Sequence, residues 1–333
     1  MIKKVFITGG GGFLGKSICK LLVKKKISCI SFSRKHYSEL EKIGVECRTG
    51  SLDEYSNILR NLDSNCDAII HTAAQAGIWG HPKELYKTNV VGTKNLIKAA
   101  KEKKIKYFVY TSSPSVVFDK RNIRYKNEDL PYAKEHLCEY AKTKRLAESF
   151  VLSQNNSDTF VTAALRPHLI WGPEDPHFLP RLIQKSREKK LFFIGNGKNL
   201  VDTIYVDNAA QAHLDLLFKM YRSNICSGKA YFIGQEKAVN LPQFINSLLS
   251  TANQPSCHKR IPFFLAYSLG FMFENFYSFF KVFHKEPKMT RFLALQLSKS
   301  HFFDHSSAKK DFGYYPKISI TEGLKLMKNS LKN

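Results

Sequence analysis

The first half of the chain alternates short apolar runs with longer stretches of helical periodicity. The apolar runs predict buried strands, and the stretches between them repeat apolar residues every three or four positions, as an amphipathic helix does. Strands are expected at 5–7, 29–32, 45–48, 68–71, 107–110 and 160–165, and helices at 14–23, 82–103 and 140–152. Fully apolar strands separated by helices are typical of a parallel sheet covered on both faces. The pattern therefore predicts a doubly wound α/β fold.

The pattern changes at about residue 172, where loops, helices and isolated strands such as 201–206 follow one another irregularly. There is no internal repeat and no linker of low complexity. We therefore expect a sheet domain over 1–170 and a smaller C-terminal portion, mainly 171–333, that is interleaved with it. Part of 200–235 is expected to return to the sheet domain.

Composition excludes some classes of protein. The seven cysteines are scattered and odd in number, without a Cys-x-x-Cys pair, which favours reduced thiols in a cytoplasmic protein. No apolar leader with a cleavage site opens the chain, which agrees with that interpretation. No His/Cys cluster has metal-ligand spacing, so no metal is expected.

The net charge of +24 raises the question of an anionic partner. Most of the basic residues are lysines, and they are spread over several predicted surface helices without forming one stripe. This distribution favours a general lysine bias over a nucleic-acid interface, so no nucleic acid is expected. Attraction to anionic lipid or to acidic substrates stays open.

A glycine-rich loop follows the first predicted strand. Its sequence, Thr8-Gly9-Gly10-Gly11-Gly12-Phe13-Leu14-Gly15, has the spacing G-x-x-G-x-x-G. Residues without Cβ allow a tight turn there, and the free N–H groups at the start of the next helix can bind a pyrophosphate. We therefore expect a Rossmann-type dinucleotide site at Gly9, Gly12, Phe13, Leu14 and Gly15.

The end of the second predicted strand indicates which dinucleotide binds. An acidic residue there would bind the ribose hydroxyls of NAD, but this chain has Ser33 and Arg34. Ser33 can donate a hydrogen bond to a 2′-phosphate, and the Arg34 guanidinium can pair with it. The sequence thus favours NADP(H) over NAD(H).

A candidate proton-transfer pair lies farther along the chain, at Tyr140 and Lys144. Residues four apart share a helix face, and an ammonium beside a phenol stabilises the phenolate. Ser113 follows a strand upstream of this pair and can hold a substrate carbonyl, with Ser112 as the nearest alternative. Two further tyrosines, Tyr132 and Tyr205, have no lysine four residues on.

Taken together, these motifs resemble the extended short-chain dehydrogenases/reductases, in the branch of the 3β-hydroxysteroid dehydrogenases and the NAD-dependent epimerase/dehydratases. Further matching segments are His71-Thr72-Ala73-Ala74, Thr88-Asn89-Val90-Val91-Gly92-Thr93, Leu165-Arg166-Pro167 and Trp171-Gly172-Pro173. The resemblance implies cofactor contacts at Ala73, Ala74, Asn89, Thr111, Lys144 and Pro167, and catalysis by Ser113, Tyr140 and Lys144. One departure is Ser51, where the family usually has an aspartate beside the adenine.

Several segments are more specifically similar to bacterial 2-alkyl-3-oxoalkanoate reductases, among them Ala76-Gly77-Ile78-Trp79-Gly80, Arg166-Pro167-His168-Leu169-Ile170-Trp171 and Thr290-Arg291-Phe292-Leu293-Ala294. This resemblance implies NADPH-dependent reduction of a 3-keto group, or oxidation of a 3-hydroxyl, on an apolar long-chain or sterol-like substrate. The alternative that the family allows is a nucleotide-sugar epimerase or dehydratase with tightly bound NAD. A homodimer through paired helices is usual in such families.

Candidates for substrate contact are fewer. Trp79, His168 and Trp171 follow predicted strands, and Arg181 is a candidate for a substrate carboxylate. The segment 261–285 is dense in aromatic residues but too short in its uncharged run to span a membrane. It can be a core helix, a wall around an apolar substrate chain, or an interfacial helix that contacts a membrane peripherally.

Overall fold

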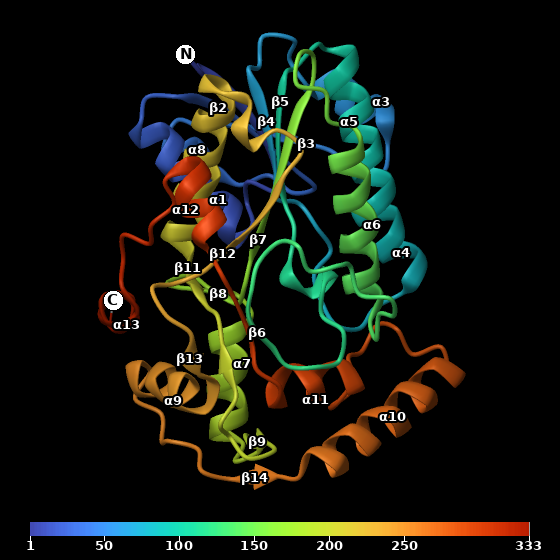
Figure 1. Ribbon diagram of the computed structural model, residues 1–333, viewed down its shortest axis with the longest axis vertical. Coiled ribbons are helices and arrows are strands. Elements are labelled where there is room, and N and C mark those ends of the chain that lie inside the picture. Colours follow the sequence, from blue (N-terminus) through green and yellow to red (C-terminus); the bar gives the residue numbers. More distant parts are fainter. Residues whose placement is uncertain (333) are drawn as a thin grey trace.

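A seven-stranded parallel sheet with helices on both faces forms the larger part of the molecule, in a computed structural model that describes residues 1–332 (Figure 1). The strand order is β3-β2-β1-β4-β5-β7-β12, and every neighbouring pair is parallel. The strands are β1 (Lys4–Thr8), β2 (Ser28–Ser33), β3 (Glu46–Thr49), β4 (Ala68–His71), β5 (Tyr107–Thr111), β7 (Val161–Pro167) and β12 (Ala230–Ile233). The doubly wound fold predicted from the apolar runs is thus confirmed.

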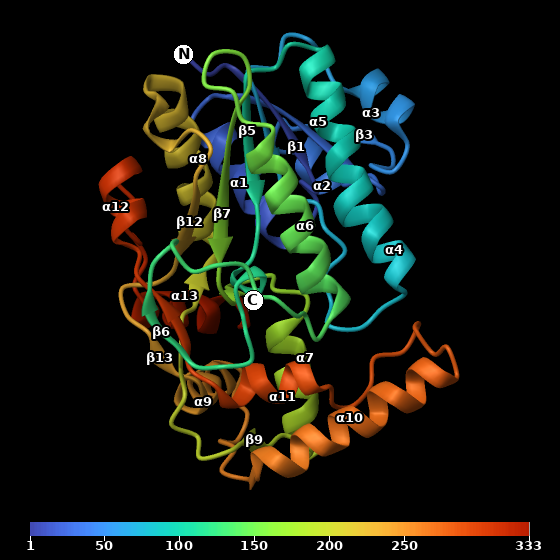
Figure 2. The same ribbon diagram turned by 45° about the vertical axis from the view of Figure 1, so that its right-hand side comes forward.

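Two helical layers cover the sheet, because its strands are apolar on both sides (Figure 2). One layer holds α1 (Phe13–Lys24), α2 (Ser38–Glu41), α8 (Val206–Arg222) and α12 (Ser306–Phe312). The other holds α3 (Tyr55–Asn61), α5 (Gly92–Glu102) and α6 (Glu139–Ser153). The strand order reverses between β1 and β4, and ligands bind in such sheets at the carboxyl ends of the strands on either side of that reversal.

The long helix expected at 82–103 is interrupted by a π-helical turn. It runs as α4 (Pro82–Tyr86), the π turn η1 (Lys87–Val91) and α5. A π turn carries one residue more than an α-helical turn, and such turns occur frequently at functional sites. Here the turn includes Asn89, whose side chain is buried.

The rest of the chain folds around the carboxyl ends of these strands. Its helices are α7 (Phe178–Arg187), α9 (Leu241–Thr251), α10 (Phe263–Phe279), α11 (Arg291–Ser298) and α13 (Ile320–Ser330). Short strands pair in three small sheets, formed by β6 (Ile123–Lys126), β8 (Ile170–Trp171), β9 (Phe193–Ile194), β10 (Leu200–Val201), β11 (Ile204–Tyr205), β13 (Val239–Asn240), β14 (Arg260–Ile261) and β15 (His301–Phe303). The single strand expected at 201–206 is instead divided between β10 and β11, which belong to different sheets.

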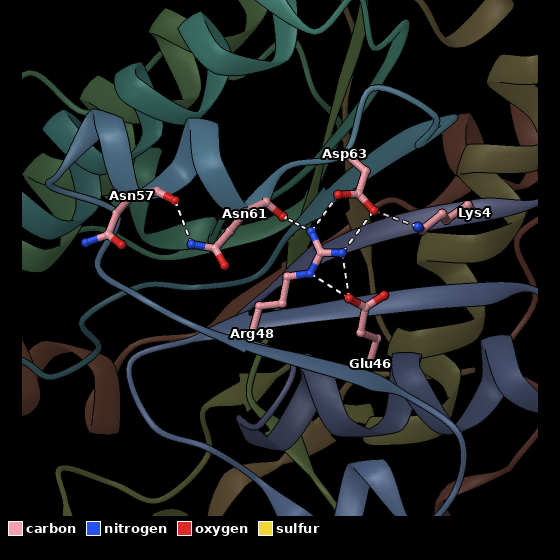
Figure 3. Close-up of polar contacts among 6 residues, drawn as sticks. All are labelled: Lys4, Glu46, Arg48, Asn57, Asn61 and Asp63. Carbon is pink, nitrogen blue, oxygen red and sulfur yellow. Dashed lines mark hydrogen bonds and ion pairs between the residues drawn. The ribbon is translucent and has the colours of Figure 1, made fainter.

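A cluster of charged and polar side chains fastens the edge strand β3 (Figure 3). Arg48 donates hydrogen bonds to both carboxylate oxygens of Asp63, at 2.6 and 3.0 Å, and to Glu46. Lys4 on β1 donates to the same carboxylate at 2.7 Å. Hydrogen bonding to Arg48 lowers the pKa of Asp63 to about 2, so this carboxylate stays ionised at neutral pH. The cluster thus fixes β3 in the sheet, and the loop that follows β3 lies near the glycine-rich loop after β1.

Candidate active site

The glycine loop makes a tight turn between β1 and α1. Gly9 has a φ of 72°, and the Gly12 N–H donates to the Gly9 carbonyl at 2.9 Å. A Cβ on Gly15 would overlap that same carbonyl oxygen, which explains the third glycine. Gly12 caps α1 without a side-chain hydrogen bond, so the first N–H groups of the helix face outward, where an anion can bind them.

A cavity of about 540 Å³ lies against this turn, at the carboxyl ends of the strands. It is lined by residues for which the sequence predicts cofactor contact, namely Gly9, Gly12, Phe13, Leu14, Gly15, Ser33, Arg34, Ala73 and Ala74. The cavity thus brings together three loops that are far apart in the chain.

The residues present fit a phosphorylated dinucleotide. The Ser33 hydroxyl is buried without a hydrogen-bond partner within the described part of the chain. The exposed Arg34 guanidinium beside it makes neither a hydrogen bond nor an ion pair with residues 1–332. A buried polar group without a partner is costly, and a bound phosphate would satisfy both side chains.

The loop after β3 supplies an acid at the same cavity that the sequence motifs did not identify. Ser51 donates a hydrogen bond to Asp53, and Lys87 pairs with Asp53 at 2.5 Å. Hydrogen bonds from Lys87 and then Ser51 lower the pKa of Asp53. Ser51 stands where the family usually has an aspartate, but the carboxylate of Asp53, two residues later, lines the same cavity.

Ser113, Tyr140 and Lys144 lie at the carboxyl end of β5, beyond the glycine loop. Ser113 begins a 3₁₀ turn, and its hydroxyl accepts hydrogen bonds from the Ser115 N–H at 3.2 Å and the Ser115 hydroxyl at 3.0 Å. Ser113 and Tyr140 line one cavity, whereas the hydroxyl of Ser112 is buried below it. The geometry therefore favours Ser113 over Ser112 as the group that meets a substrate.

Burial shifts the pKa of both proton-transfer groups. It raises the pKa of Tyr140 to about 12, although the contact with Ser113 acts in the opposite direction. Burial lowers the pKa of Lys144 to about 7, opposed by the carboxylate of Glu148. The Lys144 ammonium donates to the Thr111 carbonyl at 2.5 Å, at the end of β5. Because its pKa is about 12, the Tyr140 phenol carries its proton at neutral pH.

The side chain of Asn89, in the π turn, forms hydrogen bonds next to the helix that carries Tyr140 and Lys144. Its Oδ1 accepts from the Gln75 N–H at 2.7 Å, and its Nδ2 donates to the Gln75 carbonyl at 3.1 Å and to the Thr143 hydroxyl at 3.0 Å. Thr143 in turn donates to the Tyr140 carbonyl at 2.9 Å. Asn89 thus connects the loop after β4 to the helix that carries Tyr140. It is not among the residues that line the dinucleotide cavity.

Thr111 also faces away from that cavity. Its hydroxyl forms a hydrogen bond with His213 Nε2 at 2.8 Å, and His213 Nδ1 donates to the Ala209 carbonyl at 2.7 Å. Burial lowers the pKa of His213 to about 4, so the imidazole is neutral and its Nε2 accepts from Thr111. Through its carbonyl, Thr111 positions Lys144.

A buried ion pair holds α6 against β7. Arg166 donates to Glu148 through Nε at 3.0 Å and through Nη2 at 2.5 Å, and both side chains are buried. The guanidinium also lies 5.0 Å from the centre of the Phe232 ring. Since Lys144 is one turn before Glu148 on α6, this pair determines where the lysine lies relative to the sheet.

A second cavity, of about 250 Å³, opens beside Ser113 and Tyr140. Aromatic and aliphatic side chains dominate its lining, together with Pro167, His168, Gln296 and His301. The apolar members are Ala76, Ile78, Phe118, Leu169, Phe292 and Phe303. Residues of α11 and β15 are thereby brought to the proton-transfer pair, although no sequence motif marks them.

Of the four residues predicted to contact substrate, only His168 lines this cavity. Trp171 is fully buried in the core, edge-on to Tyr205 and Phe244. Arg181 is exposed on α7, where it pairs with Glu286 at 2.9 Å. The Trp79 indole donates to the Val282 carbonyl at 2.9 Å, so it fastens the segment after α10 to the loop after β4.

His168 and His301 form a hydrogen-bonded pair whose rings lie parallel. His168 Nε2 and His301 Nδ1 are 2.6 Å apart, and His301 Nε2 is 2.8 Å from the Gln296 carbonyl. A carbonyl only accepts, so His301 carries its proton on Nε2 and accepts from His168 at Nδ1. This leaves His168 Nδ1 as an acceptor. Burial lowers the pKa of both rings, so both are neutral at physiological pH.

Comparison with known proteins places this site in a family. Residues 6–263 match the 3-beta hydroxysteroid dehydrogenase/isomerase family. A 2-alkyl-3-oxoalkanoate reductase from Shewanella oneidensis is 42% identical, over 99% of this chain and 87% of the relative. The decarboxylating sterol-4-alpha-carboxylate 3-dehydrogenase of Mus musculus is 30% identical, over 97% and 89%. The Bordetella bronchiseptica enzyme WbmH in complex with NAD+ has the same fold, with a TM-score of 0.74 and 19% identity over 100% of this chain and 99% of that one.

Proposed function

The chain belongs to the 3-beta hydroxysteroid dehydrogenase/isomerase family of nicotinamide-dinucleotide-dependent oxidoreductases, and we propose that it reduces a 3-keto group with NADPH. Its substrate in this proposal is apolar, and a 2-alkyl-3-oxoalkanoate is the best candidate. The observation that carries the proposal is the apolar cavity that opens directly onto Ser113 and Tyr140. A small lipid ketone suits such a lining better than a sugar nucleotide does.

The proposed chemistry divides among three side chains. Bound NADPH supplies the hydride at the carbonyl carbon. Ser113 donates a hydrogen bond to the substrate oxygen, and Tyr140 gives that oxygen its proton as the alcohol forms. Lys144 lies one helical turn after Tyr140 and donates a hydrogen bond to the Thr111 carbonyl. From there its ammonium can hold the cofactor ribose and stabilise the phenolate that Tyr140 becomes when it gives up its proton.

The raised pKa of Tyr140 suits the role of proton donor in a reduction. Reduction needs a protonated phenol, and a pKa of about 12 keeps the proton in place at neutral pH. Oxidation would need the phenolate, which burial disfavours.

His168 is the substrate contact that we retain. Its Nδ1 is an acceptor in an otherwise apolar lining, since its other nitrogen is engaged with His301. A 3-ketoacid is ionised at neutral pH and has no carboxylic proton to give, so only a hydroxyl near the keto group can donate to it. This would orient the substrate so that the ketone meets Ser113.

We test the function by following NADPH oxidation with three substrates: a 2-alkyl-3-ketoacid, a 3-ketosteroid and a UDP-sugar. We expect turnover with the ketoacid and none with the UDP-sugar, because the second cavity lacks groups that pair with a diphosphate. NAD that stays bound through purification, together with conversion of the UDP-sugar, would instead show a nucleotide-sugar epimerase or dehydratase.

The preference for NADP(H) is tested at Arg34. In Arg34→Ala, the KM for NADPH should rise about ten- to hundredfold, because a charge-assisted hydrogen bond contributes ~1.5–3 kcal/mol. The KM for NADH should stay unchanged, since that cofactor has no 2′-phosphate. Arg121→Ala, which removes another exposed arginine, is the matched control. Equal effects on both cofactors would contradict the assignment.

A further inference from the structure

The outer face of α10 exposes an unusual number of large apolar side chains. The helix lies at the periphery of the molecule, in the orange part of the chain (Figures 1 and 2). Its large apolar exposed residues, with Phe280 directly after the helix, form what we call the aromatic face: Phe264 (79% exposed), Leu265 (48%), Phe271 (51%), Met272 (63%), Phe276 (57%), Phe279 (80%) and Phe280 (57%). The uncharged Asn275 and Ser278 are exposed on the same helix. An exposed apolar surface that continues over a whole helix marks an interaction site.

The inner face of α10 is already packed. Ala266, Gly270 and Glu274 are buried, and Gly270 lies against the backbone of Thr290 at the start of α11. Glu274 is the one charged residue of the helix, and it pairs with Arg291 at 2.5 Å. The aromatic face therefore contains no charge, and the helix is only half buried.

Exposed cations flank the aromatic face at both ends. Lys259 and Arg260 precede the helix, and Lys281, Lys285 and Lys288 follow it. Within the described residues 258–288 the acids are the buried Glu274 and Glu286, and Glu286 pairs with Arg181. An uncharged aromatic surface between lysines is the arrangement that binds at a lipid–water interface.

We propose that α10 docks the protein onto a membrane that contains anionic lipid. The aromatic face enters the boundary between headgroups and acyl chains, and the flanking cations meet lipid phosphates. The docking is peripheral: within residues 1–332, no helix is both long enough and apolar enough to cross a bilayer. The net charge of +24 acts in the same direction.

The docking surface is continuous with the proposed substrate cavity. The inner face of α10 packs on α11, whose Phe292 and Gln296 line that cavity. Trp79 ties the segment after α10 to the loop that carries Ile78, a further lining residue. Docking would thus bring the cavity close to a membrane surface from which an apolar substrate can enter, a consequence that rests on the proposed function.

The experiment measures binding of the full chain to vesicles, without substrate or cofactor, so its outcome is independent of the proposed function. Vesicles of phosphatidylcholine are compared with equal mixtures of phosphatidylcholine and phosphatidylglycerol by sedimentation. We expect binding to the mixed vesicles that weakens as salt is added. The variant Phe264→Ser/Phe271→Ser/Phe279→Ser should bind about a hundredfold more weakly, because three apolar side chains no longer leave water.

The matched control is Tyr125→Ser/Leu200→Ser/Tyr315→Ser, which removes three exposed apolar residues elsewhere. It should bind vesicles like the unaltered chain. Circular dichroism and gel filtration of both variants establish that each is folded. Equal vesicle binding by the two variants, or no binding by the unaltered chain, overturns the proposal. A change from dimer to monomer in the α10 variant, without vesicle binding by the unaltered chain, overturns it in favour of self-association.

Discussion

Tyr140→Phe is expected to lower kcat by about 10²- to 10⁴-fold, because the phenol is the one proton donor that we assign to the reaction. The ring keeps its packing in this variant, and only the hydroxyl that faces Ser113 is removed. Lys144 keeps its hydrogen bond to Thr111. The Kd for NADPH, measured by fluorescence titration, should therefore stay the same while turnover is lost.

Tyr86→Phe serves as the control, since Tyr86 is exposed on α4 and lines neither cavity. It should leave kcat and the Kd for NADPH unchanged. Turnover near that of the unaltered chain in Tyr140→Phe would remove Tyr140 from the mechanism. A large loss of NADPH affinity in that variant would instead assign the residue to cofactor binding.

Glu148→Gln is expected to reduce the free energy of unfolding by about 3–5 kcal/mol, because it leaves the buried Arg166 guanidinium without its counter-charge. Urea unfolding followed by circular dichroism measures this loss. Water can compensate the guanidinium only slightly, because Glu148 is fully buried and the Arg166 side chain is 5% exposed. Lys144 would also lose the neighbouring charge that raises its pKa, so activity should fall in addition to stability.

Two further variants separate the ion pair from simple packing. Glu148→Leu combined with Arg166→Met removes both charges and should recover most of the lost stability, since paired hydrophobic replacements are often neutral. Glu188→Gln, which breaks the exposed pair with Lys190, should have little effect. If the double variant were as unstable as Glu148→Gln, the loss of stability would come from altered side-chain packing and not from the unpaired charge.

The features that the sequence predicts well depend on neighbours in the chain. Each strand of the parallel sheet is a short apolar run, and burial on both faces follows from that run alone. The glycine spacing around Gly9 and Gly15 reflects a turn that leaves no room for a Cβ, which is also a local requirement. The fold class can therefore be predicted from local patterns in the sequence.

The substrate side depends on contacts between distant segments, and the sequence predicts it poorly. His168 meets His301, which is 133 residues later in the chain, and no pattern connects the two. Trp171 and Trp79 look equally suitable as pocket residues, but one is a core side chain and the other fastens a loop. The segment 261–285 has aromatic residues on all sides, so periodicity could not separate its packed face from its exposed one.

The π turn at Lys87–Val91 makes this stretch of helix sensitive to chain length. Successive residues of an α-helix are rotated by about 100°, so loss of the extra residue would turn the residues after it, Asn89 included, by that amount relative to α4. Asn89 would then face away from Gln75 and Thr143, although its own codon were untouched. Deletion of one residue between α4 and Asn89 should therefore damage the active site. A deletion in an exposed loop shifts no comparable helical register.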